Sequence, residues 1–294
     1  MATSPFRFKE IGPWSKGINN ILPEAELPLD ALQDAVNVDL MPNGLPRTRT
    51  DWERVYPGSV HSFFVHNDRS YGVVDDLVGE LTETGFVGMG SAGGEVHWAT
   101  LNGEVIYSNP AGVFRLGKGQ ITDGLNSDEY DLDDQLSPLP GGHWVAYWNG
   151  RLVVARGSAL LFSEPLRYGA YNPRKGYIQL ESRIEWFAEL EEGIFVGLKD
   201  KVLFLQGRSP LDMKIEVVAG TSAPGMALVL SGENFALGDV SPTKVAVFFT
   251  KNGFTIGLPS GEVTYPQRGS VNDLPLFRGK LIVDHNRIYA VRGF

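Results

Sequence analysis

The sequence predicts an all-β protein: a β-propeller-like ring of five or six blades, each of three to four strands, preceded by an extended N-terminal arm. Two observations carry this prediction. The 294-residue chain contains 35 glycines, most of which fall between short apolar runs, as expected for many strands joined by tight turns. A unit of three short strands and two tight turns also recurs at intervals of roughly 30 to 60 residues, which is typical of propeller blades.

Composition excludes several kinds of protein. Hydrophobic residues make up 43% of the chain, enough for one large all-β domain or two smaller ones. The absence of cysteine excludes a disulfide framework, a thiolate nucleophile and a cysteine-based zinc site. A net charge of -9 argues against a protein that grips nucleic acid by its phosphates, because that task needs a basic surface. No apolar run reaches transmembrane length and residues 1–10 lack a secretory signal, so we expect no membrane span and synthesis in the cytoplasm.

The first predicted element is an arm over residues 1–35. Its segment WSKGINNILPE (14–24) shows neither the apolar spacing of a helix nor the alternation of a strand. The following PLDALQDAV (28–36) has helical character, because Pro28 suits a first turn and Asp30 lies near the positive end of a helix dipole. We therefore expect an extended arm that ends in one or two helical turns.

The ring is predicted over residues 36–294. The segment VNVDLMPNGLPRTR (36–49) predicts a hairpin that completes the final blade and so closes the ring. The central turns at Asn102-Gly103, Asn149-Gly150 and Asn252-Gly253 are strong hairpin signals, since Asn and Gly accept the positive φ of a type I′ turn. The six repeated units occupy residues 60–74, 96–116, 143–162, 183–205, 243–265 and 274–291.

A β-sandwich and a β-solenoid are the alternative all-β folds. A sandwich predicts single strands at an even spacing of about 8 to 12 residues. Here the strands are grouped in threes, which favours the propeller.

Sequence motifs for chemistry are weak. The GMGSAG run at 88–93 matches the dinucleotide pattern GxGxxG, but a predicted strand follows it where a phosphate-binding helix is required. The acidic run 123–134 departs from EF-hand spacing, which leaves a solvated loop and a calcium site as alternatives. The five histidines are scattered singly. We predict no catalytic residue, no cofactor-binding residue and no metal site.

Two other classes of function remain open on the residues alone. An enzyme needs residues brought together by the ring; a glycan hydrolase would use two carboxylates, and the SxDxGxTW repeats of sialidase-like propellers do not occur. His97 and His143 precede tryptophans at equivalent points of two units, which favours a shared packing role. A lectin-like binding module would use pocket aromatics, although aromatics at equivalent blade positions also suit a core; the candidates are Trp98, Trp144, Tyr147 and Trp148.

Two segments resemble a known family. Residues 14–49 are similar to the opening of a group of tailed-bacteriophage virion proteins, which runs W-x-x-G-I-N-N, then L-P, then A-x-N-V, a turn and an arginine-rich segment. LLFSEPLRYGAYNPRKGYIQL (160–180) is similar to their segment S-x-P-x-x-x-G-x-Y-x-P. The chain thus resembles the tail-accessory or head-stabilisation proteins of short-tailed phages, which form the nozzle or hub below the portal and adaptor.

The resemblance implies a non-catalytic β-propeller subunit, assembled as a ring of six copies in the virion tail or neck. Its expected partners are further copies of itself, the tail adaptor or tube, and tail fibre or spike proteins. Double-stranded DNA would pass through the ring without specific binding, and an acidic lumen would repel its phosphates. The alternative is a carbohydrate-binding or glycan-degrading tail protein.

Two groups of residues follow as site candidates. The arm would fold on a neighbouring copy through the apolar anchors Trp14, Ile18, Ile21 and Leu22. Asn19 and Asn20 would satisfy backbone groups at the seam, because side-chain amides both donate and accept hydrogen bonds; packing of the arm on its own ring is the alternative. The acidic candidates for the lumen or a gate are Asp123, Asp128, Glu129, Asp131, Asp133 and Asp134.

Overall fold

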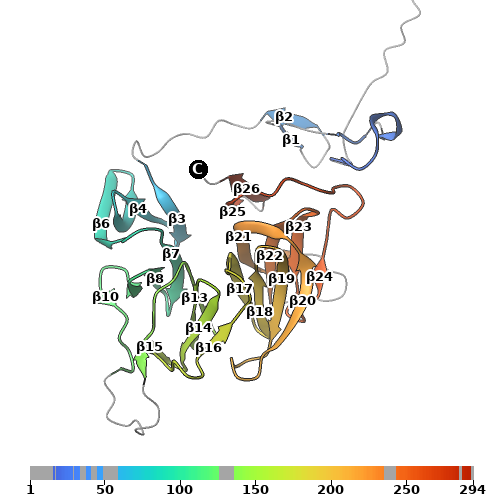
Figure 1. Ribbon diagram of the computed structural model, residues 1–294. Helices are drawn as coiled ribbons and strands as arrows, with labels where there is room; N and C mark the ends of the chain where they lie inside the picture. Colours follow the sequence, from blue (N-terminus) through green and yellow to red (C-terminus); the bar gives the residue numbers. More distant parts are fainter. Residues whose placement is uncertain are drawn as a thin grey trace, which may run out of the picture.

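The structure is a computed structural model, and it describes residues 16, 18–28, 30–33, 38–40, 45–48, 59–125, 136–234, 243–284 and 287–292. These residues form an all-β protein with a five-bladed β-propeller arrangement, which confirms the predicted fold class. Figure 1 shows the blades following one another in chain order around a central axis. No helix within the described ranges is long and apolar enough to cross a membrane.

The blades are antiparallel sheets, and in four of them consecutive strands pair. Blade three differs: it has six strands rather than the predicted three to four, its first strand pairs with its fifth, and its sixth pairs with its fourth. Blade one contains β3 (His61–His66), β4 (Arg69–Val74), β5 (Leu77–Thr82) and β6 (Gly85–Ser91). Blade two contains β7 (His97–Leu101), β8 (Glu104–Asn109), β9 (Gly112–Arg115) and β10 (Gly119–Gln120). Blade three contains β11 (Ser137–Pro138), β12 (Trp144–Trp148), β13 (Arg151–Arg156), β14 (Ala159–Glu164), β15 (Arg167–Tyr171) and β16 (Tyr177–Gln179).

The remaining elements complete the arc of the ring and the arm. Blade four contains β17 (Trp186–Leu190), β18 (Gly193–Gly197), β19 (Lys201–Gln206) and β20 (Lys214–Gly220). Blade five contains β21 (Ser222–Ser231), the 3-10 helix η2 (Gly232–Asn234), β22 (Lys244–Thr250), β23 (Gly253–Gly257) and β24 (Val263–Thr264). The two-stranded sheet of β25 (Gly279–Asp284) and β26 (Arg287–Arg292) follows, with β25 beside β21. The arm and hairpin contain the 3-10 helix η1 (Glu24–Glu26), β1 (Val38–Leu40) and β2 (Pro46–Thr48).

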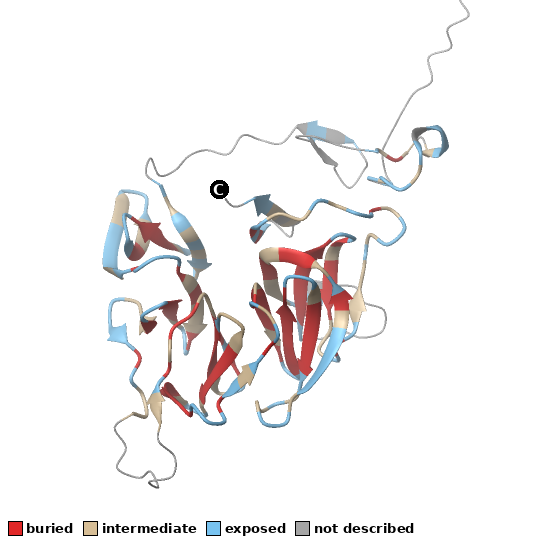
Figure 2. Cartoon of the chain, viewed as in Figure 1, coloured by how far each residue is buried: buried red, intermediate tan, exposed pale blue. Residues whose placement is uncertain are grey.

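The core lies between neighbouring blades. The inner strands β7, β12, β17, β21 and β25 pack side by side around the axis, and each cluster of buried side chains joins the sheets of two successive positions. Figure 2 shows these buried residues running along the middle of the sheets. The packing between blades therefore depends on apolar residues contributed by both sheets.

Tryptophans also tie one blade to the next by hydrogen bonds. The Nε1–H of Trp98 in blade two donates to the carbonyl oxygen of Ser62 in blade one. The Nε1–H of Trp148 donates to the carbonyl oxygen of Leu190 across 2.7 Å, from blade three to blade four. Because a buried indole N–H needs a partner, these bonds fix the placement of the rings at the blade interfaces.

The predicted hairpin turns are present, with one difference. Both residues have positive φ at Asn102-Gly103 and at Asn149-Gly150, as in a type I′ turn. At the third pair, only Gly253 has positive φ. There the backbone N–H of Asn252 donates to Thr250 Oγ1 across 3.2 Å, so a side-chain bond shapes this turn.

The predicted helix at 28–36 is wrong for the described residues of that stretch. Residues 30–33 form a turn, a β-bridge and a bend, and the short 3-10 helix lies earlier, at Glu24–Glu26. The reason is pairing within the arm: Ile18 forms a parallel bridge with Leu32, and the carbonyl oxygens of Asp30 and Leu32 accept backbone N–H groups from residues 16 and 19. Those carbonyls are therefore not used in helical bonds.

Two expectations about ring closure also need correction. The last unit, 274–291, contains only two strands, because residues 274–278 are not in a strand and Leu274, Leu276 and Phe277 pack on the core of blade five. The 36–49 hairpin exists as β1 paired with β2. Among the described strands it forms a sheet of its own and does not pair with β25–β26, so the expected closure is not seen. The boundary between arm and ring near residue 36 falls outside the described residues and stays a prediction.

Candidate functional site

The apolar side chains of the arm are largely exposed to solvent. Ile18 and Ile21 keep 39% and 45% of their surface exposed, and Leu22 is half-buried. Asn19 Oδ1 accepts the backbone N–H groups of Ile21 and Leu22 at 3.1 and 3.2 Å, so it shapes the turn of the arm itself. Trp14 lies outside the described residues.

Asn20 attaches the arm to its own chain. Its Nδ2 donates to the Asn272 carbonyl oxygen across 3.1 Å, and its Oδ1 accepts the Asn272 N–H across 3.0 Å. Its backbone N–H donates to the Ser270 carbonyl oxygen at 3.0 Å. In this single chain the Asn20 amide thus satisfies backbone groups of the loop that precedes β25. The predicted seam with a neighbouring copy stays a prediction.

Only one of the six acidic candidates for a lumen or gate lies in the described residues. Asp123 receives two hydrogen bonds from the Arg115 guanidinium, at 2.6 and 3.3 Å. This carboxylate is therefore paired in blade two and offers no free negative charge. The other five candidates fall outside the described residues: Asp128, Glu129, Asp131, Asp133 and Asp134. Within the described ranges, no group of three or more His, Asp or Glu side chains is placed to hold a metal ion.

The inner strands line an open-sided cavity of about 430 Å³ near the ring axis, called the axial cavity below. This volume is in the range of small-ligand sites, roughly 300 to 1,000 Å³. Aromatic side chains form much of its wall, and their exposure ranges from 1% for Phe187 to 49% for Phe63. The aromatic members of the wall are Phe63, Phe64, Trp98, Trp144, Tyr147 and Phe187.

Four ionisable side chains reach this axial cavity: His97, Glu189, Lys244 and Lys280. Burial raises the pKa of Glu189 to about 7, against a smaller lowering by Lys244. Burial lowers the pKa of His97 well below its ordinary value, and the Lys280 charge lowers it further. Burial also lowers the pKa of Lys280, although Glu95 opposes this. As whole residues, Lys244 and Lys280 are exposed to solvent and His97 and Glu189 are half-buried, so the cost of burying charge is greatest for the latter two.

The two histidines that precede tryptophans share a structural role. The His97 ring stacks on Trp144 with 4.0 Å between ring centroids, and its Nδ1 lies 3.1 Å from the Val145 carbonyl oxygen. His143 Nε2 lies 2.7 Å from the Ile184 carbonyl oxygen. Each imidazole thus contacts the backbone of the next blade, as the expected packing role requires.

A stability measurement checks the protonation of Glu189. Its folded-state pKa of about 7 exceeds the ordinary value of 4.5, so the folded chain binds the extra proton between these pH values. The resulting stability is complete below about pH 4.5 and is lost as pH rises through 7. Relative to Glu189→Gln, the wild type should lose about 1 to 3 kcal/mol of unfolding free energy between pH 5 and 8.

Urea unfolding of both proteins at the two pH values measures this difference. Glu191→Gln, an exposed substitution in the adjacent turn, is the matched control and should follow the wild type. Parallel pH profiles for the wild type and Glu189→Gln would contradict the assignment.

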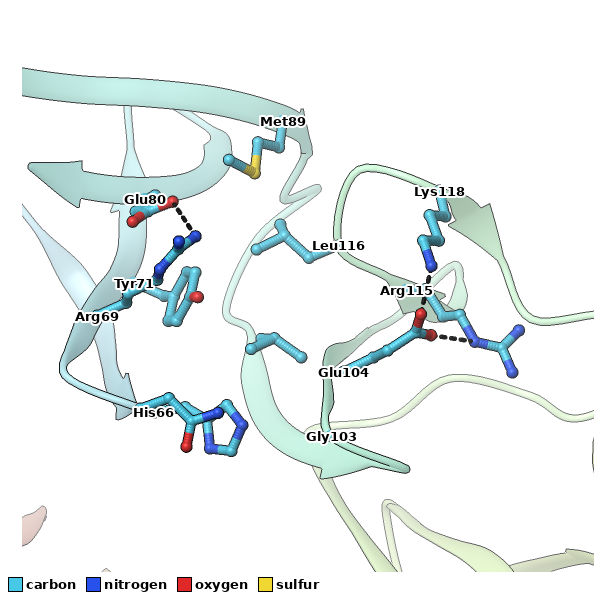
Figure 3. Close-up of a pocket in the computed structure, with 12 residues that line it drawn as sticks. His66, Arg69, Tyr71, Glu80, Met89, Gly103, Glu104, Arg115, Leu116 and Lys118 are labelled. Atoms are coloured by element: carbon cyan, nitrogen blue, oxygen red, sulfur yellow. Dashed lines mark hydrogen bonds and ion pairs between the residues drawn. The ribbon is translucent and has the colours of Figure 1, made fainter.

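A second cavity, of about 530 Å³, lies between blades one and two. Figure 3 shows Arg69 beside Glu80 on one wall, and Glu104 between Arg115 and Lys118 on the other. Arg115 is paired with Asp123 as well. The cations of this outer cleft are therefore already neutralised by carboxylates, which leaves the axial cavity as the site with unused charge.

Some of the aromatic residues of the axial cavity could be named from the sequence, whereas its charged residues Glu189, Lys244 and Lys280 were missed. Trp98, Trp144 and Tyr147 line the cavity, but Trp98 and Trp148, at 4% and 3% exposure, belong to the core, which leaves Trp144 and Tyr147 as the accessible members of the four. The available signal for Glu189 was a lone carboxylate inside the apolar strand WFAEL.

The fold and the site together define a five-bladed β-propeller with an axial cavity. No family model and no curated protein matches the chain. Among solved structures, it is similar to the extracellular domain of a two component system protein from B. thetaiotaomicron (TM-score 0.45, 11% identity, covering 79% of this chain and 31% of that one). It is also similar to the Neurospora crassa Pan2 WD40 domain (TM-score 0.45, 12% identity, 77% and 69%). A third is an auxiliary nutrient binding protein from Bacteroides thetaiotaomicron (TM-score 0.45, 11% identity, 79% and 66%). The chain thus spans about a third of the first of these proteins.

Proposed function

We propose that this protein is a structural subunit of a tailed-bacteriophage virion. In this proposal its N-terminal arm assembles it into a ring of six copies, which continues the DNA conduit in the tail nozzle, hub or neck. The observation that carries the proposal is the exposure of Ile18 and Ile21, at 39% and 45%. Apolar side chains on an arm without a core of its own gain burial only from another surface, and a neighbouring copy supplies one.

Two features of the sequence support the same proposal. Residues 14–49 and 160–180 resemble segments of tailed-phage virion proteins. The net charge of -9 per copy, multiplied over a ring, gives a negative field that repels DNA phosphates and so lets a duplex pass without being held.

A head-to-tail ring needs two different surfaces on each copy. We assign the second surface to β20, the outermost strand of blade four, whose far edge pairs with no other described strand. Ile215 and Val217 are two residues apart, so their side chains lie on the same face of β20, where they are 48% and 65% exposed. An extended segment can add to such an edge through backbone hydrogen bonds. The arm of one copy then covers β20 of the next.

A mixing experiment tests this arrangement. The arm variant Ile18→Asp with Ile21→Asp and the strand variant Ile215→Asp with Val217→Asp should each be monomeric, because a buried unpaired carboxylate is costly. An equimolar mixture should give dimers and no rings, since only one intact arm and one intact strand can meet. Sedimentation velocity distinguishes monomer, dimer and ring.

The matched control changes the other face of the same strand. Lys214→Ala with Glu216→Ala removes two exposed side chains and should leave assembly unchanged. Rings formed by either Asp variant would contradict the proposal, and a mixture that stays monomeric would show that the arm and β20 do not meet.

A further inference from the structure

The axial cavity contains charged groups that the fold does not use. Glu189, Lys244 and Lys280 all line it, and none of the three forms an ion pair with another described residue. The outer cleft differs, since its arginines and lysine are paired with carboxylates. Lys244 and Lys280 are exposed to solvent at the wall of the open-sided cavity, so their ammonium groups are available to a ligand, and unpaired charged groups in a cavity are common where proteins bind ligands.

The sign of the charge indicates the sign of the ligand. Two ammonium groups, Lys244 and Lys280, and one carboxyl group, Glu189, line the cavity, and the Glu189 pKa of about 7 leaves this carboxyl partly protonated near neutral pH. His97 is neutral there, because its pKa is well below the ordinary value. The cavity is thus positive within a chain whose net charge is -9, so it favours an anion over a neutral ligand or a cation.

The walls indicate the rest of the ligand. Tyr147 is 40% exposed and Trp144 is half-buried on the same inner strand, β12, and both line the cavity beside Phe187. Flat aromatic faces suit the apolar C–H face of a sugar ring, while Glu189 and His97 offer hydrogen-bond partners for hydroxyl groups. A few polar groups set in an aromatic wall are typical of small-ligand sites.

We propose that the axial cavity binds an acidic sugar, as a free hexuronate or as the end of a glycan chain. The carboxylate of the sugar pairs with Lys280, Lys244 adds to the positive potential of the cavity, the sugar ring lies against Trp144 and Tyr147, and its hydroxyls bond to Glu189 and His97. This site is independent of the arm and of β20. A failed binding test would therefore leave the proposal of ring assembly untouched, and a failed assembly test would leave this site untouched.

Isothermal titration of the full-length chain tests the site with three small molecules. D-Glucuronate carries all the proposed features, D-glucose lacks the carboxylate, and cyclohexanecarboxylate lacks the hydroxyls. We expect glucuronate to bind with a Kd of about 1 mM and each of the others at least about tenfold more weakly. A glucuronate-terminated disaccharide, titrated in parallel, shows whether the site takes a chain end as well as the free sugar.

Variants assign the binding to the cavity. Lys280→Met keeps the aliphatic stem and should weaken glucuronate binding about tenfold or more while leaving glucose unchanged. Tyr147→Ala should weaken the binding of both glucuronate and glucose. Lys251→Met is the matched control: Lys251 is an exposed lysine paired with Asp273 outside the cavity, and its loss should change binding less than about twofold.

Three results would overturn the proposal. They are no heat of binding with any of the sugars, equal affinity for glucuronate and glucose, or unchanged glucuronate affinity in a folded Lys280→Met variant. The thermal unfolding midpoint of each variant, measured first, establishes that it is folded.

Discussion

A chain that lacks residues 1–27 is expected to be a folded monomer in conditions where the full chain forms rings. The physical reason is that the arm contributes little to the fold of the ring. None of the described side chains between residues 16 and 27 is buried. The arm is held by backbone hydrogen bonds to residues 30, 32 and 270 and by the pairing of Asn20 with Asn272, and exposed hydrogen bonds of this kind contribute only about 1 kcal/mol each.

Deletion of the arm should therefore lower the stability of the propeller only slightly and should abolish assembly of the copies. Analytical ultracentrifugation gives the oligomeric state, and urea unfolding gives the stability of the same samples. Asn20→Ala is an intermediate variant, which loosens the attachment of the arm while keeping Ile18 and Ile21. A truncated chain that still assembles like the full chain would contradict the role given to the arm.

Trp186→Ala is expected to be the most damaging single substitution in the ring. Trp186 is fully buried, its ring packs on Phe248 with 5.1 Å between centroids, and its Nε1–H donates to Ser222 Oγ across 3.1 Å. These contacts join blade four to blade five. Truncation leaves a large cavity, which costs about 3 to 5 kcal/mol, out of a total stability that is usually about 5 to 15 kcal/mol.

Two variants separate the causes of that loss. Trp186→Phe keeps most of the ring and removes the donor to the buried Ser222 hydroxyl, so we expect a smaller loss of about 1 to 3 kcal/mol. Leu211→Ala, at a position 67% exposed, is the control and should change stability by less than about 0.5 kcal/mol. Urea unfolding followed by tryptophan fluorescence measures all three. A Trp186→Ala protein as stable as the control would contradict the packing between these blades.

Gly197, in β18, lies directly against the Trp186 ring. A Cβ at this position would lie 2.2 Å from the Trp186 ring, which is far inside van der Waals contact. The strand β18 can pass beneath the indole only because this residue is glycine.

The blades could be predicted because their turns are encoded locally. Asn102-Gly103 and Asn149-Gly150 specify their backbone conformation within two residues, and the structure has positive φ at both members of each pair. The outer strands are harder to predict. β10 and β24 have two residues each, too few to show the alternation that identifies a strand.

The axial cavity could not be predicted in the same way, because residues far apart in the sequence create it. Glu189 lies in β17, Lys244 in β22 and Lys280 in β25, and only the ring topology places them around one axis. The pKa of Glu189 depends on burial by the whole ring, which no local pattern encodes. The arm shows a similar limit: pairing between Ile18 and Leu32 replaced the helix that local propensity favoured.

The central claim is that this propeller forms a closed ring of its own copies. Native mass spectrometry of the purified full-length protein, with electron microscopy of the same sample, tests it most directly. We expect a mass of six copies and a ring with a central hole of about 20 to 40 Å, wide enough for B-DNA. A protein that remains monomeric at assembly concentrations, or that forms open filaments without a central hole, would contradict the claim.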